Sequence, residues 1–463
     1  MPHLNEKCGV FGVYGKNLDV ARITFFGLFA LQHRGQESSG IAVADGTSIA
    51  CHKDSGLVAQ VYTEVDIEKL KGYIAIGHNR YSTSEGTGPA HAQPVMARDG
   101  AIALAHNGNL PSTTALKNFL NDKGIAINGS NDSELMAKAV GYFLEHGHSL
   151  GQAVKQAFPL FTGAFSLLVM TASELAAVRD EYGVRPLSMG SLENGAMVFA
   201  SETCALKTVG AKFEREVAPG EMVVVSPNGL QIEQLAPAKT KMDIFEFVYF
   251  ARPDSEILGK SVYEVRKNCG KILAREKPLS ADVVVPVPET AIPVALGYAQ
   301  ATGIPLEMAL IKNRYIHRTF IRPDQQSREK DVQLKLNPIA HLLNGKRVVL
   351  MDDSIVRGTT SRKLVKTLFR CGAREVHFLV SSPPVRYPDF YGIDTPKQEK
   401  LIAATKSVKE IKKFLGATSL SYLSLAGLIE ATGLPPELFC TSCFTGDYPI
   451  DLRERKSEVK KLT

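Results

Sequence analysis

The segment Val348–Ser361 constrains the fold more than any other part of the chain, because an apolar strand pattern runs directly into two adjacent acids. Asp352 and Asp353 end that strand, and a loop of hydroxyl residues, a glycine and an arginine leads to a helical pattern from about Arg362. Open α/β sheets bind ligands at the carboxyl ends of their strands, and a small-residue loop at a helix N-terminus suits a phosphate. Adjacent carboxylates can hold sugar hydroxyls or a divalent ion, so the segment predicts a ligand with ribose and phosphate parts. The alternative is an ordinary strand–turn–helix with exposed acids.

The chain after about Ile244 alternates between strand and helix patterns. The predicted strands are Ala281–Val287, Lys346–Met351 and Val376–Ser381, and the predicted helices are Ile292–Thr302, Arg362–Cys371, Leu401–Lys406, Val408–Leu415 and Leu425–Thr432. This alternation predicts a parallel sheet in a doubly wound α/β domain. The tail after Pro449 is charged, and we expect it to be loose.

The first half has a different pattern, with short apolar runs separated by glycine turns. The predicted strands are Cys8–Tyr14, Ile41–Val43, Ile74–Gly77, Ala101–Ala105, Phe165–Met170, Met197–Ala200 and Met222–Val225, and the predicted helices are Val20–Gln32, Asp132–Glu145 and Leu150–Phe158. This spacing predicts layered sheets with helices outside. Ser226–Asp243 carries prolines and glycine and is predicted to be a linker.

Composition limits the classes of function. The 463 residues predict two or three domains. No apolar run reaches the ~18 residues that a membrane-spanning helix needs, and Met1–Lys7 lacks the apolar core of a secretory signal. The net charge of +6, without a dense basic run, fits a small anionic substrate and argues against nucleic acid. The seven cysteines form no regular framework, which is typical of a reducing compartment. We therefore expect a cytoplasmic protein that binds neither nucleic acid nor membrane.

The acidic segment resembles the signature of the type I phosphoribosyltransferases. In that family the two acids contact the ribose hydroxyls of 5-phosphoribosyl 1-pyrophosphate, and the following loop binds its 5′-phosphate. The resemblance implies a substrate site formed by Asp352, Asp353, Ser354, Arg357, Gly358, Thr359 and Thr360.

Two further segments fit that site. Pro286–Thr290 ends a predicted strand and is placed to meet pyrophosphate and metal, and the resemblance implies Thr290, Asp352 and Asp353 as the ligands of Mg²⁺. Lys312 opens a polar stretch that runs through Asn337, and its length predicts a mobile lid.

Displacing pyrophosphate from C1 of ribose develops positive charge on the sugar and negative charge on the leaving group. Mg²⁺ and the lysines Lys312 and Lys335 can stabilise the leaving oxygens, with Tyr315 beside them, and a closing lid excludes water. A solvated surface lysine is the alternative for Lys335.

Strand ends in the first half carry a second set of polar residues. Cys8 precedes the first strand, and His106-Asn107-Gly108 ends another with an amide and a glycine N–H, which are the parts of an oxyanion hole. Arg80 suits a carboxylate, and Asp132 starts a helix. The alternatives are a core cysteine and, for Asp132, a helix cap.

With Leu31–Gly40, these residues resemble the N-terminal-nucleophile glutamine amidotransferases. In those enzymes a leader is removed, so that the catalytic cysteine becomes the first residue and its α-amino group, of pKa ~8, is the general base. We therefore predict cleavage between Lys7 and Cys8.

The resemblance also assigns roles to the other residues of the set. Cys8 would attack the glutamine amide, and Asn107 and Gly108 would hold the oxyanion. Arg80 and Asp132 would bind the α-carboxylate and α-amino groups of glutamine.

A glutaminase ahead of a phosphoribosyltransferase resembles the amidophosphoribosyltransferase family over nearly the whole chain. Phe245–Ser255 and Tyr391–Asp394 are typical of that family. The resemblance implies an α/β protein, α+β in its N-terminal part, with an αββα glutaminase domain followed by a parallel-sheet domain. The expected boundaries are a propeptide at 1–7, domains at 8–235 and 244–440, and a tail at 441–463.

The same resemblance implies an activity and partners. Ammonia from L-glutamine would attack ribose C1 to give 5-phosphoribosylamine, the first committed step of purine synthesis, with Mg²⁺ as cofactor. It also implies a homotetramer or homodimer inhibited by purine nucleotides of the AMP or GMP type.

The resemblance raises the question whether this chain carries an iron–sulfur cluster. Many members carry a [4Fe–4S] cluster on four cysteines, of which Cys440 and Cys443 match two. Asp243 and Asp389 stand at the other two positions, and carboxylate is a poor substitute for thiolate on such clusters. The cluster is therefore absent, labile or held by mixed ligation.

Two rival functions remain. The glutaminase half can be inert, leaving an ammonia-dependent or regulatory protein, or the chain can be a purine nucleotide sensor. The presence of every named residue argues against decay of the first half, and Asp352 with Asp353 favours catalysis over sensing.

Overall fold

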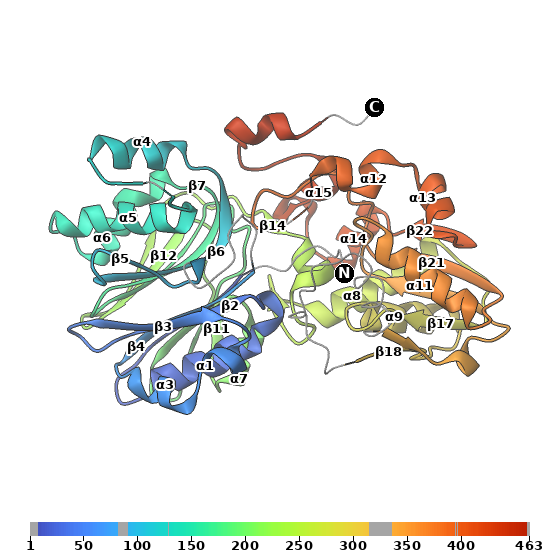
Figure 1. The fold of residues 1–463 in the computed structure, drawn as a ribbon, viewed down its shortest axis with the longest axis horizontal. Coiled ribbons are helices and arrows are strands. Elements are labelled where there is room, and N and C mark those ends of the chain that lie inside the picture. The colour runs from blue at the N-terminus through green and yellow to red at the C-terminus, as the bar shows by residue number, and fades with distance from the viewer. Residues whose placement is uncertain are drawn as a thin grey trace.

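The computed structural model describes residues 8–81, 91–127, 129–313, 336–393, 395 and 397–460. The chain forms two halves that lie side by side, with the first half on the left of Figure 1 and the second on the right.

Two antiparallel sheets form the centre of the first half. The first sheet contains, in spatial order, β11 (Lys212–Glu216), β9 (Ser188–Ser191), β10 (Met197–Ala200), β1 (Gly9–Tyr14), β4 (Ile74–Arg80), β2 (Ser38–Ala44) and β3 (Ile49–Ser55). The second contains β13 (Gly229–Gln234), β12 (Glu221–Ser226), β8 (Leu175–Arg179), β7 (Thr162–Met170), β6 (Ile102–Ser112) and β5 (Val95–Ala97). The strand β1, which follows Cys8, therefore lies at the middle of its sheet.

Helices cover the outer faces of the two sheets (Figure 1). Those on the first sheet are α1 (Val20–Ala30), α2 (Val58–Val61), α3 (Glu64–Lys69) and α7 (Thr203–Thr208). Those on the second are α4 (Thr114–Asp122), α5 (Asp132–Glu145) and α6 (Leu150–Ala157). Small and branched side chains such as Val10, Ile76, Ala105 and Leu168 fill the space between the sheets. The predicted αββα layering is confirmed.

The second half is built on a parallel sheet with the order β17 (Val283–Pro286), β20 (Arg347–Asp352), β21 (Glu375–Val380) and β22 (Ser419–Tyr422). Successive strand residues point to opposite faces. Val349 and Met351 accordingly pack under α8 (Val262–Glu276), α9 (Ile292–Thr302) and α14 (Leu425–Thr432). Val348 and Leu350 pack under α11 (Thr359–Arg370), α12 (Ile402–Thr405) and α13 (Val408–Leu415). The predicted parallel α/β sheet is confirmed.

Two local expectations differ from the structure. The predicted linker begins with a hairpin, because β13 pairs with β12 at the edge of the second sheet before the chain crosses over. The tail is not loose throughout: η8 (Arg453–Glu458) follows Pro449, and Glu454 accepts hydrogen bonds from Ser112 and Thr114 of the first half at 3.0 Å each. These contacts hold the end of the described chain against β6.

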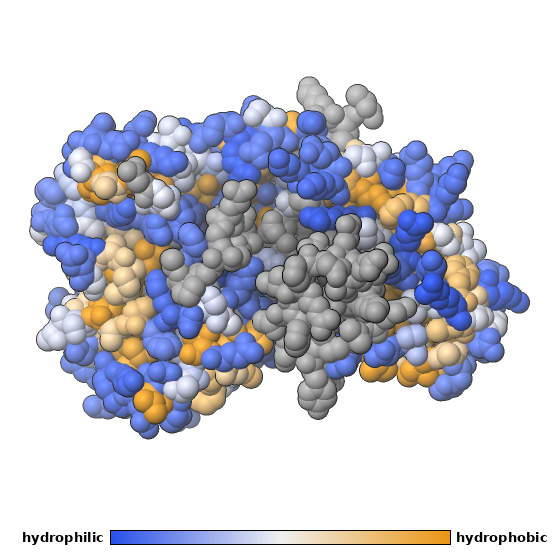
Figure 2. Space-filling view, in the orientation of Figure 1, coloured by the Kyte–Doolittle hydropathy of each residue, from blue (hydrophilic) through white to orange (hydrophobic). Residues whose placement is uncertain are grey.

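The surface is mainly polar. Figure 2 shows polar residues over most of the visible face, with apolar residues in smaller patches. Among the described residues, no helix combines the length and apolar character needed to cross a membrane.

Candidate active sites

Cys8 lies one residue before β1, next to the end of β4. The register pairs Gly9 with Asn79, which brings Cys8 beside Arg80. The thiol is 4.0 Å from the carbonyl oxygen of Tyr81. Burial raises the pKa of Cys8, against the opposing effect of Arg80. A partly buried thiol of raised pKa needs a base to become a nucleophile.

Ser201 connects the Cys8 strand to Asn107. The Ser201 hydroxyl accepts the N–H of Val10 at 2.9 Å, and the Asn107 amide Nδ2 donates to the same oxygen at 3.4 Å. Asn107 is fully buried, and its Oδ1 atom has no hydrogen-bond partner. The structure thus brings Cys8 and the predicted oxyanion residue together, although they belong to different sheets.

Asp132 lies at the start of α5, but it is not the helix cap. Asn131 is the N-cap, and its side chain accepts the N–H of Glu134 at 2.9 Å. Asp132 instead accepts the N–H of Leu110 at 3.2 Å, which joins the helix to β6 beyond Gly108. The charges of Asp132 and Arg80 both act on Cys8. The alternative of a simple cap is therefore wrong for Asp132, and the carboxylate faces the candidate site.

Buried ion pairs join the Cys8 site to the second half. Arg34 donates from Nε to the Cys8 carbonyl oxygen at 3.2 Å and from Nη2 to Glu246 at 2.9 Å. Glu202 accepts a further bond from Arg34 at 2.5 Å. Glu246 belongs to η4 (Glu246–Phe250), just after the crossover. Charges this deeply buried are stable only when paired, so this network fixes the two halves against each other.

Asp352 and Asp353 lie at the carboxyl end of β20, where each is 2% exposed. Thr290 and Ser354 donate hydroxyl hydrogen bonds to Asp353. Burial raises the pKa of Asp352, and the neighbouring charge of Asp353 raises it further. Two adjacent buried carboxylates repel each other, so the pair favours a cation or hydroxyl donors in front of it.

The loop after the acids has the form of a phosphate cradle. Gly358 adopts a φ of 73° as the N-cap of α11, so the helix starts at Thr359 rather than at the predicted Arg362. The Thr360 hydroxyl is buried without a hydrogen-bond partner. A helix N-terminus with an unpaired hydroxyl fits an anionic ligand. Arg357 lies in the same loop, two residues before the helix.

The predicted pyrophosphate residues are partly described. Lys312 ends β18 (Leu310–Lys312), and its Nζ is 3.6 Å from Glu289, beside Thr290. The segment Pro286–Thr290 therefore contacts Asp353 through Thr290 and Lys312 through Glu289. Tyr315 and Lys335, like most of the predicted lid and the leader 1–7, lie outside the described residues.

The acid pair fits a Mg²⁺ ion that is completed by water and substrate better than it fits a metal held wholly by protein side chains. The described residues contain no group of three or more His, Cys, Asp or Glu side chains that could hold a metal ion. Mg²⁺ commonly binds through one or two carboxylates plus water and substrate phosphates. Asp352, Asp353 and the Thr290 hydroxyl supply oxygen atoms of that type.

The residues at the predicted cluster position do not fit an iron–sulfur cluster. Asp243 pairs with Cys440 between β14 (Met242–Asp243) and β23 (Phe439–Cys440), and the Cys443 sulfur is 4.0 Å from Asp389. Arg185 lies 2.9 Å from Asp243 and 3.7 Å from Asp389. Iron–sulfur clusters take thiolates, but two of these four groups are carboxylates paired with an arginine.

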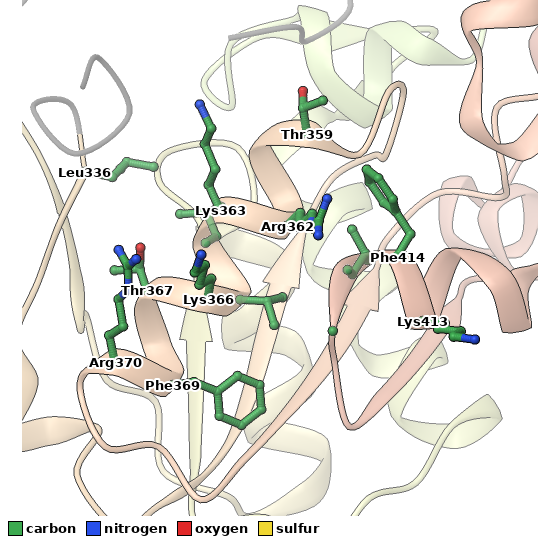
Figure 3. Close-up of a pocket in the computed structure, with 14 residues that line it drawn as sticks. Leu336, Thr359, Arg362, Lys363, Lys366, Thr367, Phe369, Arg370, Lys413 and Phe414 are labelled. Atoms are coloured by element: carbon green, nitrogen blue, oxygen red, sulfur yellow. The ribbon is translucent and has the colours of Figure 1, made fainter. Parts of the chain in front are cut away.

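A basic hollow of about 850 Å³ lies on the outer side of α11. Its lining includes Arg362, Lys363, Lys366 and Arg370 of α11 together with Lys413 and Phe414 of α13 (Figure 3). The Arg362 guanidinium is 5.0 Å from the Phe414 ring centre. The hollow shares only Thr359 with the predicted phosphate loop, so it is separate from the acid pair.

Sequence reasoning missed Ser201 and Arg185, and it gave no role to Glu246, which lies inside the family-typical segment Phe245–Ser255. Each is buried and polar, and each contacts a predicted site residue or holds the two halves together. No motif marks Ser201 or Arg185; only the rule that buried polar groups have partners could have pointed to them.

Comparisons with known proteins agree with both halves. A model of the glutamine amidotransferase domain matches residues 78–208, and a model of the phosphoribosyl transferase domain matches residues 255–419. The chain is 48% identical over 462 residues to the amidophosphoribosyltransferase of Synechococcus elongatus, covering 98% of this chain and 93% of that protein. It is 46% identical to the Bacillus subtilis amidophosphoribosyltransferase, covering 97% and 95%.

A solved structure is similarly close. The glutamine phosphoribosylpyrophosphate amidotransferase of Bacillus subtilis, complexed with ADP and GMP, superposes with a TM-score of 0.89 at 44% identity, covering 96% of this chain and 98% of that one. The fold and the two polar clusters define a glutamine amidotransferase joined to a phosphoribosyltransferase. At this identity over almost its full length, the chain belongs to the amidophosphoribosyltransferase family.

Proposed function

We propose that the chain transfers the amide nitrogen of L-glutamine to 5-phosphoribosyl 1-pyrophosphate, giving 5-phosphoribosylamine, glutamate and pyrophosphate. This is the first committed step of purine synthesis. The observation that carries the proposal is that one chain holds both clusters. Cys8 precedes the strand that Ser201 joins, through Val10, to Asn107, and the buried pair Asp352–Asp353 precedes a phosphate loop. The family to which the chain belongs supports the same reaction.

In the glutaminase half, the Cys8 sulfur attacks the amide carbon of glutamine. The carbonyl oxygen becomes an oxyanion, which Asn107 Nδ2 and the Gly108 N–H stabilise. Collapse of this intermediate breaks the C–N bond and releases ammonia, and water then hydrolyses the thioester to glutamate. Arg80 and Asp132 hold the α-carboxylate and α-amino groups of glutamine.

The raised pKa of Cys8 suggests why a leader would be removed from this chain. Desolvation raises the pKa of this partly buried thiol above its ordinary value, so the thiol needs a proton acceptor within reach. Cleavage between Lys7 and Cys8 would free an α-amino group with a pKa of ~8 on the same residue. We propose that residues 1–7 are a propeptide and that the active chain begins at Cys8.

In the phosphoribosyl half, ammonia attacks C1 of ribose and pyrophosphate leaves. Asp352 and Asp353 accept hydrogen bonds from the ribose hydroxyls, and Ser354, Arg357, Gly358, Thr359 and Thr360 bind the 5′-phosphate. We assign binding of the leaving pyrophosphate to Lys312, Tyr315 and Lys335. The domain boundaries 8–235 and 244–440, with a tail at 441–463, remain our proposal.

Bound Mg²⁺ would neutralise charge on the leaving pyrophosphate, with Thr290, Asp352 and Asp353 as its protein-side oxygen donors. These same carboxylates orient the ribose hydroxyls, so they act on both parts of the substrate. Arg266 on α8 places a positive charge near Asp353, and this charge favours the ionised acid.

Purine nucleotides are the regulators that we propose. The Bacillus subtilis relative was solved with ADP and GMP, which supports inhibition of this chain by purine nucleotides of the AMP or GMP type. We also propose a homotetramer or homodimer in the cytoplasm.

The test replaces Cys8 with alanine and measures product formation with each nitrogen source. Cys8→Ala removes the nucleophile, so glutamine-dependent pyrophosphate release should fall by more than ~10³-fold, whereas release with ammonium should stay unchanged. Cys51→Ala, a cysteine of β3 in the same sheet, is the matched control and should keep both activities. Intact mass of the active wild-type protein should lack residues 1–7.

Other outcomes would favour a rival. A wild-type chain that uses ammonium but not glutamine would support an inert glutaminase half. A chain that binds purine nucleotides and releases no pyrophosphate with either source would support a sensor. Loss of both activities in Cys8→Ala would contradict two separate sites.

A further inference from the structure

A turn from the second half lies directly against the candidate oxyanion strand of the first. The Asn109 amide on β6 donates to the carbonyl oxygen of Phe390 at 2.8 Å. A Cβ atom on Gly392 would lie 3.1 Å from both the Cα and the carbonyl carbon of Gly108. The backbones of Gly392 and Gly108 are therefore in contact, although 284 positions, counted from 108 to 392, separate them in the sequence.

The turn 389–393 is held rigidly by buried polar groups. Asp389 accepts the N–H groups of Tyr391 and Ile393, each at 2.8 Å. Arg185 of the first half donates from Nε to the Tyr391 carbonyl oxygen at 2.8 Å. The Tyr391 hydroxyl donates to Ile450 at 2.7 Å. Every one of these contacts is buried, so the turn cannot shift without breaking several hydrogen bonds.

Gly108 needs such support because its backbone is unusual. Its φ is 152°, and a Cβ atom there would lie 2.0 Å from the Ala164 carbonyl oxygen on β7. Gly108 therefore has contacts from β7 and from Gly392, which fix the orientation of its peptide group. An oxyanion donor loses much of its effect when it is misplaced by less than an ångström.

We propose that the turn 389–393 is a positioning element of the glutaminase site, supplied by the phosphoribosyl half. Within this turn, Gly392 fixes the orientation of the Gly108 peptide group. This inference rests on the proposed function, because it assigns Gly108 to the oxyanion site. It goes further in making the first site incomplete without a segment of the second half. The Arg185–Asp389 contact, at 3.7 Å, then serves to lock this turn.

The test variant is Gly392→Ala. The added methyl group meets Gly108 backbone and sits at a φ of 113°, so it should displace Gly108 by a few tenths of an ångström. The kcat for glutamine hydrolysis should fall by about 10–100-fold with little change in KM, because the oxyanion forms only in the transition state. Ammonia-dependent synthesis should be retained.

A second readout separates positioning from general damage. Alkylation of Cys8 by iodoacetamide needs the thiolate but no oxyanion donor, so its rate should match wild type. Gly433→Ala is the matched control: Gly433 has a φ of 62°, ends α14 in the same half, and has only the Lys260 ammonium nitrogen, 3.8 Å away, near a new Cβ. This control should keep wild-type glutamine turnover.

Asn109→Ala provides a milder variant if Gly392→Ala does not fold. It removes the hydrogen bond to Phe390 alone and should lower kcat for glutamine by about 3–10-fold, in line with one neutral hydrogen bond. Wild-type kcat in both variants would overturn the inference, as would slowed alkylation together with a raised KM. A wild-type chain without glutaminase activity would instead contradict the proposed function.

Discussion

Three groups stabilise the ionised Asp353 carboxylate: the Thr290 and Ser354 hydroxyls, which donate hydrogen bonds, and the positive charge of Arg266. The sequence predicted the acid, the loop and Thr290 because each follows the carboxyl end of a strand. Arg266 was not predicted, since it lies inside the helix α8, which carries no motif. In the same way Asn131, not Asp132, is the N-cap of α5. The sequence could not distinguish them, because Asn and Asp are both common N-cap residues.

Asp353→Asn tests the acid pair. The substitution keeps the shape but removes the charge that faces ribose and metal, so pyrophosphate release should fall by ~10²-fold or more with either nitrogen source. Glutamine hydrolysis at Cys8 should persist. Asp282→Asn is the control, because Asp282 pairs with Arg347 at the opposite end of β20. Equal loss of turnover in both variants would contradict a specific role for Asp353.

The ends of helices were predicted well where a residue with a clear capping preference stands at the end. The helix α9 matches its prediction because Gly303, at a φ of 72°, provides the C-cap. The start of α11 was placed three residues late, since the apolar periodicity begins only after the loop has turned into the helix. The strand β13 was missed although Leu230 and Ile232 alternate with polar residues, because the prolines and glycine around it indicated a linker.

His78 offers a test of how the two sheets of the first half are joined. This residue of β4 is fully buried, with Nε2 at 3.0 Å from the His106 carbonyl oxygen on β6. Burial lowers the pKa of His78 from 6.5 to about 3. Between these values the unfolded chain binds a proton that the folded protein does not, so stability should fall as the pH falls through this window.

His78→Gln removes that titration. Below about pH 6.5 the free energy of unfolding should then depend less steeply on pH than in wild type, by up to ~1.4 kcal/mol per pH unit, which corresponds to one proton. Urea unfolding between pH 7 and 5 measures both slopes. Parallel curves for the two proteins would show that His78 does not resist protonation in the folded state.

At the scale of the molecule, the sequence predicted two halves but not how they meet. Composition shifts and motifs mark each domain separately, whereas the joint consists of single buried residues far apart in the chain. Arg34 and Arg185 of the first half pair with Glu246 and Asp243 of the second. The turn 389–393 adds backbone contact at Gly108. This joint supports the view that the two sites work as one unit.

In the proposed reaction, nitrogen freed at Cys8 is used at the Asp352–Asp353 site of the same molecule. The most direct measurement supplies glutamine labelled with ¹⁵N in its amide group, together with 5-phosphoribosyl 1-pyrophosphate and an excess of unlabelled ammonium. Mass spectrometry then gives the isotope in the phosphoribosylamine. We expect a product that carries mainly ¹⁵N from the wild-type chain, and an unlabelled product from Cys8→Ala. A wild-type product whose isotope content matches the ammonium in solution would contradict it.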